Sequence, residues 1–177
     1  LVAHSMGGLV TRYYIGFFYD DRLNAHPKNI RKFVMIGTPN HGAWDAKFGR
    51  VISTGITEYI TGEAGKQLQP DSELLAKINQ KPLNPEIYYY TIAGTGWRTS
   101  ARDWTISWNG DGIVLVESVK LDGVPIYCTY DAHSGELYFG AAANYNAYQN
   151  NKGKGVFGIG GVHTSSDAVY EIVKNVI

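Results

Sequence analysis

The chain of 177 residues contains one cysteine, no excess of either charge and no long apolar run. A single cysteine, Cys128, excludes a disulfide within the chain. Sixteen basic and sixteen acidic residues cancel, so no basic surface for nucleic acid and no electrostatic attraction to anionic membranes are expected. Charge blocks, internal repeats and runs long enough to span a bilayer are also missing. The remaining composition, 44% hydrophobic and 18% charged, suits one globular domain or part of one.

Three short apolar segments predict buried strands, namely residues 32–36, 87–93 and 124–130. The third includes Cys128, which we expect to be a small buried side chain. Residues 94–110 carry several glycines and are expected to form a loop.

Helical patterns lie between and after these strands. Residues 8–18 predict one helix, Asp71 is expected to cap a second, short helix, and residues 164–176 predict a terminal amphipathic helix. Strands that alternate with helices are typical of an α/β fold, with a mostly parallel sheet flanked by helices. Open α/β sheets place their sites in the loops after the strands.

The most informative motif is Ala3-His4-Ser5-Met6-Gly7, followed by Gly8. It has the form of a nucleophile elbow, in which a serine occupies a sharp turn between a strand and a helix. Small residues beside the serine let the backbone turn tightly, so that the hydroxyl projects from the sheet. Ser5 is therefore the candidate nucleophile.

A serine nucleophile needs a histidine base, which is oriented by a carboxylate. Asp111, in a glycine-flanked turn, and His163, just before the terminal helix, follow Ser5 in the order acid then base. His133 also follows a predicted strand and remains an alternative base. The other candidate acids are expected to be solvated; they are Asp103, Asp122 and Asp131.

With these residues in place, the chain resembles the C-terminal part of an α/β-hydrolase lipase of the bacterial triacylglycerol lipase type. Besides the elbow, residues 36–42 resemble the T-P-x-H-G segment after the next strand, and residues 110–114 resemble the acid loop. Residues 67–75 resemble a cap-region run of lipases related to inositol deacylases. The resemblance implies that residues 1–177 are the later part of one domain, and that its N-terminal strands precede this chain.

The resemblance also implies the chemistry. Ser5 would attack an acyl ester or lipid, His163 would act as base and Asp111 would orient it. The backbone N–H of Met6 would be one donor to the oxyanion, and a second would come from the missing N-terminal half. The resemblance implies no cofactor and no metal. It also implies transient contact with a lipid interface, and it suggests that the protein is secreted.

Two segments are expected as additions to the basic fold, a cap or lid at about residues 44–80 and an insertion at about residues 131–161. Trp97, Trp104 and Trp108 either pack the loop before Asp111 or form an apolar lip for acyl chains. His41 is expected to order its loop through hydrogen bonds.

Two other functions stay open. An acyltransferase would use the same triad while excluding water, and a hydrolase-fold binding protein would have lost its catalytic geometry. The position of a histidine relative to Ser5 and Asp111 distinguishes an enzyme from a binding protein.

Overall fold

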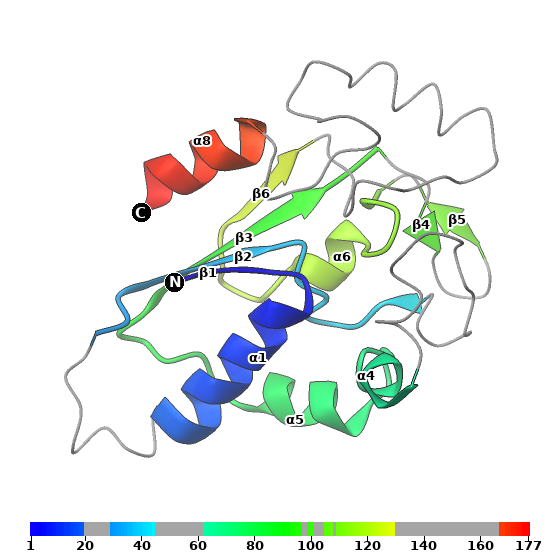
Figure 1. Ribbon diagram of the computed structural model, residues 1–177, viewed down its shortest axis with the longest axis horizontal. Helices are drawn as coiled ribbons and strands as arrows, with labels where there is room; N and C mark the ends of the chain where they lie inside the picture. Colours follow the sequence, from blue (N-terminus) through cyan, green and yellow to red (C-terminus); the bar gives the residue numbers. More distant parts are fainter. Residues whose placement is uncertain (20–28, 45–61, 97–98, 101–104, 108, 130–166) are drawn as a thin grey trace.

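The computed structural model describes residues 1–19, 29–44, 62–96, 99–100, 105–107, 109–129 and 167–177. Its centre is a four-stranded sheet with the order β1-β2-β3-β6, in which every pair is parallel (Figure 1). The strands are β1 (Val2–His4), β2 (Lys32–Ile36), β3 (Tyr88–Gly94) and β6 (Ile126–Thr129). The three strands expected from the sequence are thus confirmed, within a residue or two at their ends.

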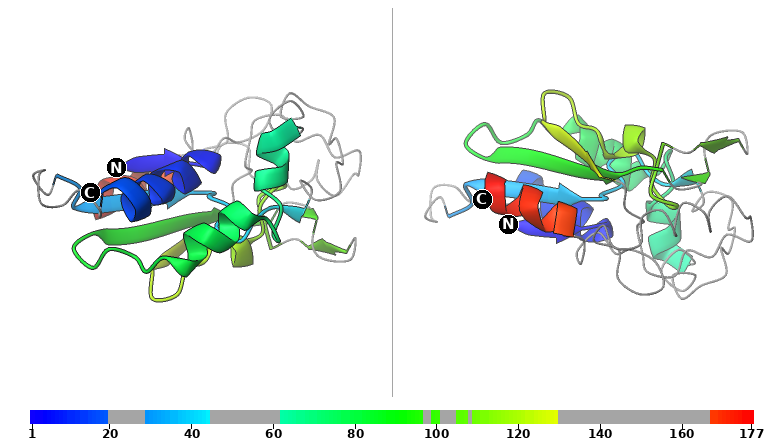
Figure 2. Two further views of the ribbon diagram at one scale, coloured as in Figure 1. Left: turned by 90° about the horizontal axis from the view of Figure 1, so that it is seen from below. Right: turned by 90° about the horizontal axis from the view of Figure 1, so that it is seen from above.

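Helices cover both faces of the sheet. Helix α8 (Asp167–Val176) lies on one face, whereas α1 (Met6–Tyr14), α5 (Glu73–Gln80) and α6 (Val116–Val119) lie on the other (Figure 2). Side chains alternate along each strand, and β2 shows the consequence. Val34 and Ile36 pack against α8, while Phe33 and Met35 pack toward α1. Because both faces of β2 are covered, its sequence is a continuous apolar run.

The first helix differs from its expected range. Helix α1 begins at Met6, directly after Ser5, and ends at Tyr14, where the chain continues as the π-helical segment η1 (Ile15–Tyr19). Tyr13 of α1 stacks on Phe17 of η1, with the two ring centroids 4.6 Å apart. The sequence pattern predicted one helix over 8–18, because the change from α to π spacing leaves the apolar character unchanged.

Ser72, and not Asp71, caps helix α5. The Oγ atom of Ser72 accepts a hydrogen bond from the backbone N–H of Leu75 at 3.3 Å. Leu75 and Ile78 are buried on the face that packs toward α1, as the spacing predicted. Helix α4 (Gly62–Gln67) precedes α5, so residues 62–80 of the predicted cap contain two helices. Their role as a cap remains a prediction.

Two expectations for later segments were wrong. Cys128 is exposed and lies in β6, the last strand in the described sheet order. Residues 94–110 are not wholly a loop, since β4 (Thr99–Ser100) and β5 (Ile106–Ser107) form a small antiparallel sheet there. The predicted insertion at 131–161 lies outside the described residues.

Candidate active site

Ser5 occupies a strained turn between β1 and α1. Its backbone angles are φ 54° and ψ −133°, and it is the only residue other than glycine with a positive φ in the described part of the chain. A left-handed φ is unfavourable for a residue with a side chain and persists only where neighbouring structure enforces it. Here the Ser5 N–H donates to the carbonyl of Ile36 at 2.8 Å, and the Ser5 carbonyl accepts from the N–H of Gly8 at 3.0 Å. Ser5 thus lies in the sharp turn between a strand and a helix that the sequence motif predicts.

Helix α1 lies very close to Thr38, which follows β2, and Gly8 is the residue of α1 at this contact. A Cβ atom on Gly8 would lie 2.6 Å from Cγ2 and 2.8 Å from Cβ of Thr38. Gly7 is different, since a Cβ there would meet only Ala3 Cβ at 3.9 Å. Of the two glycines in the motif, Gly8 is therefore the one that the packing requires.

Asp111 lies at the start of a tight turn and is fully buried. Its Oδ1 atom accepts hydrogen bonds from the N–H groups of Ile113, at 3.0 Å, and Val114, at 2.7 Å. Gly112 has a φ of 99° and donates its N–H to Thr99 Oγ1 at 2.8 Å. Two N–H donors on one oxygen stabilise a carboxylate in its charged form. Asp122, one of the alternative acids, is exposed as expected; Asp103 and Asp131 lie outside the described residues.

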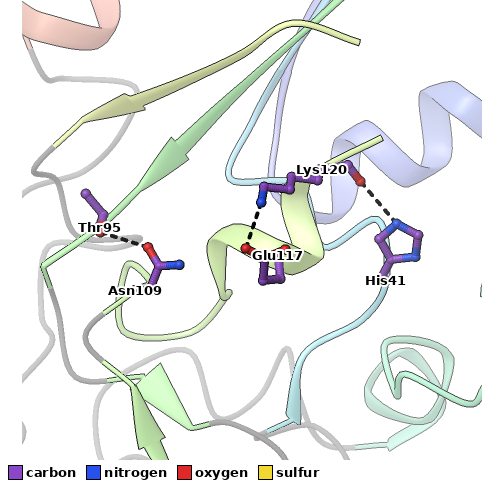
Figure 3. A network of polar contacts seen from close by, with 5 residues as sticks. All are labelled: His41, Thr95, Asn109, Glu117 and Lys120. Carbon is purple, nitrogen blue, oxygen red and sulfur yellow. Dashed lines mark hydrogen bonds and ion pairs between the residues drawn. The ribbon is translucent and has the colours of Figure 1, made fainter. Parts of the chain in front are cut away.

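The loop after β2 is tied to helix α6, which follows the turn of Asp111. The N–H of His41 donates to the carbonyl of Ser118 at 3.0 Å, and its ring Nε2 lies 3.1 Å from the carbonyl of Lys120 (Figure 3). Since a carbonyl can only accept, this contact requires the proton on Nε2. Ser118 Oγ donates to the carbonyl of Gly42 at 2.6 Å. His41 thus orders its loop, as the sequence predicted.

A second contact ties the same turn to the end of β3. Thr95 Oγ1 donates a hydrogen bond to Asn109 Oδ1 at 3.4 Å (Figure 3). Farther along the chain, Glu117 and Lys120 form an exposed ion pair at 2.7 Å (Figure 3). Such a pair at the surface contributes little to stability. The hydrogen bonds of Ser118 with His41 and Gly42 connect α6 to the loop after β2.

Arg12 and Asn40 form a buried polar network that the sequence patterns did not indicate. Arg12 Nη1 donates to Asn40 Oδ1 and to Asn79 Oδ1, both at 3.0 Å. Asn40 Nδ2 in turn donates to the carbonyl of Val119 at 2.8 Å, and Asn79 Nδ2 donates to the carbonyl of Asn40 at 2.8 Å. The network connects helix α1, which follows Ser5, with helix α6, which follows Asp111. The partners are 28 to 79 residues apart in sequence, beyond the reach of local patterns.

Burial lowers the pKa of Arg12 to about 10, and an electrostatic interaction with Tyr89 opposes part of this shift. The guanidinium is therefore still charged at neutral pH.

His163 and its alternative His133 lie outside the described residues, as do Trp97, Trp104 and Trp108. Within the described segments, no group of three or more His, Cys, Asp or Glu side chains could hold a metal ion. None of the helices in those segments has the length and apolar character needed to cross a membrane.

Comparison with known proteins decides the family. Residues 1–106, more than half of the chain, match the family model described as lipase (class 2). The chain belongs to the class 2 lipase family. None of the curated proteins matches this chain.

Solved structures support the fold. Phospholipase PlaB from Legionella pneumophila is 18% identical, with a TM-score of 0.52 over 67% of this chain and 28% of its own. The mature lipase BlEst2 from Bacillus licheniformis is also 18% identical, with a TM-score of 0.53 over 74% of this chain and 57% of its own. This chain thus spans 28% of the length of the first structure and 57% of the length of the second. Together with the parallel sheet, the likeness shows an α/β-hydrolase fold, as predicted.

Proposed function

We propose that the protein hydrolyses acyl esters, lipids among them, through an acyl-enzyme formed on Ser5. The observation that carries this proposal is the φ of 54° at Ser5, between β1 and α1, in a chain of the class 2 lipase family. A strained serine at the carboxyl end of a strand is the arrangement that exposes a nucleophile to substrate. Asp111 is the proposed acid and His163 the proposed base.

In this mechanism His163 accepts the proton of Ser5 as the hydroxyl attacks the ester carbonyl. The N–H of Met6, directly after Ser5, donates to the oxyanion of the tetrahedral intermediate. Collapse of that intermediate breaks the ester bond, and His163 gives its proton to the leaving alcohol. Water then attacks the acyl-enzyme with His163 again as base, which releases the acid and restores Ser5.

A second oxyanion donor is proposed to come from a segment N-terminal to β1. Strand β1 is an edge strand of the described sheet, and Leu1 and Val2 are 55% and 50% exposed. An exposed apolar edge is unfavourable unless another strand covers it. Intact-mass measurement of the native protein tests this, since a mass of only 19.5 kDa would contradict the proposal.

Covalent labelling of the native protein with a fluorophosphonate tests the nucleophile. Labelling and hydrolysis of p-nitrophenyl esters are both expected to disappear in Ser5→Ala. The matched control is Ser72→Ala, which removes the same hydroxyl from the cap of α5 and should reduce stability by about 1 kcal/mol while labelling persists. An unlabelled wild-type protein would favour a non-catalytic binding protein.

Variants and products decide the remaining alternatives. His163→Ala should abolish acylation and His133→Ala should not; the reverse result would transfer the role of base to His133. Free acid as the main product in the presence of an alcohol indicates a hydrolase, whereas a new ester indicates an acyltransferase. Higher rates on emulsified than on dissolved esters would demonstrate the transient lipid interface.

A further inference from the structure

The small sheet of β4 and β5 places a threonine beside the turn that carries Asp111. The two strands pair so that Thr99 lies opposite Ser107. The chain leaves β5 at Ser107 and enters the turn directly afterwards, where the Asn109 N–H donates to Ser107 Oγ at 3.0 Å. Strand pairing therefore brings Thr99 next to the turn that follows its partner strand.

Thr99 is fully buried and meets this turn at two points. Its Oγ1 atom accepts a hydrogen bond from the Gly112 N–H at 2.8 Å. On the other side, a Cβ atom on Gly110 would lie only 2.8 Å from Thr99 Cβ, so a glycine at this position lets the two segments come together. Threonine is branched at Cβ and has few side-chain rotamers, which fixes the direction of its hydroxyl.

The hydrogen bond to Gly112 acts directly on the backbone of Asp111. The peptide group between these two residues is planar, so an acceptor that fixes the Gly112 N–H also fixes the direction in which the chain leaves Asp111. Gly112 then turns the chain with a φ of 99°, and the N–H groups of Ile113 and Val114 reach Asp111 Oδ1. The position of the carboxylate therefore depends on Thr99 through one peptide group.

A contact between Thr95 and the same segment is weaker. Thr95 Oγ1 lies 3.4 Å from Asn109 Oδ1 in an exposed position, whereas Gly112 is buried where it donates to Thr99. A buried N–H that loses its acceptor is unfavourable. Removal of the Thr99 hydroxyl should therefore shift the turn until the Gly112 N–H finds another partner.

We propose that Thr99 is a positioning residue, which holds the Asp111 carboxylate in the orientation that the catalytic histidine needs. The inference rests on the proposed function, in which Asp111 orients His163. A displaced carboxylate would orient the imidazole less well and stabilise its positive charge less. The expected consequences are a lower kcat and a changed pH profile at an unchanged KM.

Two variants of the full-length protein separate the hydroxyl from the shape of the side chain. Thr99→Val keeps the branched shape and loses the acceptor, and it should lower kcat for p-nitrophenyl esters by roughly 10²-fold. Thr99→Ser keeps the acceptor and loses a buried methyl group, so it should retain most of kcat although its Tm falls. Thr105→Val, the same substitution at an exposed position just before β5, is the matched control and should keep full activity.

The pH profile distinguishes positioning from a loss of stability. The acid limb of kcat/KM reports the pKa of the catalytic histidine in the free enzyme. A carboxylate that is farther away stabilises the imidazolium less, so this pKa should fall and the limb should move to lower pH in Thr99→Val but not in Thr99→Ser. A smaller folded fraction alone would lower the rate at every pH and leave the limb in place.

Three results would overturn the role of Thr99: a wild-type kcat in Thr99→Val, equal losses of kcat in Thr99→Val and Thr99→Ser, or an unshifted acid limb in Thr99→Val. If Thr99→Val fails to fold, Gly110→Ala replaces it, because the added Cβ would push Thr99 away from Gly112. Its acid limb should also move to lower pH, and an unshifted limb would again overturn the role.

Fluorophosphonate labelling of the wild type separates this inference from the proposed function. An unlabelled wild type contradicts both. A labelled wild type combined with any of the overturning results contradicts the role of Thr99 alone.

Discussion

Gly8 in helix α1 lies directly against Thr38, so that a Cβ on Gly8 would be 2.6 Å from Thr38 Cγ2. Thr38 is fully buried behind the end of β2 and cannot move away freely. The contact sets how closely helix α1 approaches the sheet.

Gly8→Ala should therefore displace α1 and distort the turn at Ser5. Overpacking of this kind costs about 1–3 kcal/mol, and we expect both the free energy of unfolding and kcat to fall. Gly7→Ala is the matched control, because that Cβ would have room, and alanine favours the helix by up to about 1 kcal/mol. Urea unfolding and ester hydrolysis of both variants provide the measurement. Equal losses in the two variants would contradict this interpretation.

Asp111→Asn tests the acid without disturbing its turn. The amide oxygen can still accept the hydrogen bonds from Ile113 and Val114, so stability should change little. Loss of the negative charge should lower kcat by about 10⁴-fold if Asp111 orients the catalytic histidine. Asp122→Asn, at an exposed position, serves as the control and should keep full activity.

Asn40→Ala tests the connection between α1 and α6. It would leave the buried carbonyl of Val119 and one donor of Arg12 without partners, at a cost on the order of 2–3 kcal/mol. Asn79→Ala removes another partner of the same network from a more exposed position and should cost about 1 kcal/mol. Similar melting temperatures for the two variants would argue against a special role for Asn40.

Arg12→Lys makes stability depend on pH. A lysine buried here should have a pKa below its usual value, for the same reason that the pKa of Arg12 is lowered to about 10. Between the folded and unfolded pKa values, the unfolded state then binds more protons, so the free energy of unfolding rises with pH. Compared with wild type, the variant should be less stable at pH 7, with a smaller deficit as the pH approaches the usual lysine pKa of about 10.4. A deficit that does not change with pH would refute this prediction.

The sequence predicted best those features that depend on neighbouring residues. Residues 32–36 could be identified as a buried strand because both faces of β2 are covered, which leaves a continuous apolar run. The elbow at Ser5 was recognisable because its strained φ requires small neighbours, a requirement that the motif states directly.

Features that depend on the order of strands and on distant contacts could not be predicted. Cys128 has the pattern of a buried strand residue, but it is exposed in β6, the last strand in the described sheet order. Arg12 looks like one polar residue in an apolar helix, and its partners Asn40 and Asn79 are far away in sequence. Serine and aspartate both cap helices well, so the sequence could not decide between Asp71 and Ser72. The backbone geometry makes Ser72 the cap of α5.

Along the chain, each new strand of the four-stranded sheet pairs with the previous strand of that same sheet. Such a sheet can assemble in the order of synthesis, with every new strand adding beside one already in place. The turn at Ser5 is an exception to this order, because its hydrogen bond to Ile36 can form only after β2 has been made. The hydrogen bonds between the loop of residues 38–43 and α6 can likewise form only after α6 has been made. Ser5 would therefore be translated before the segments that hold its backbone turn, and the turn would become fixed only as those later segments fold.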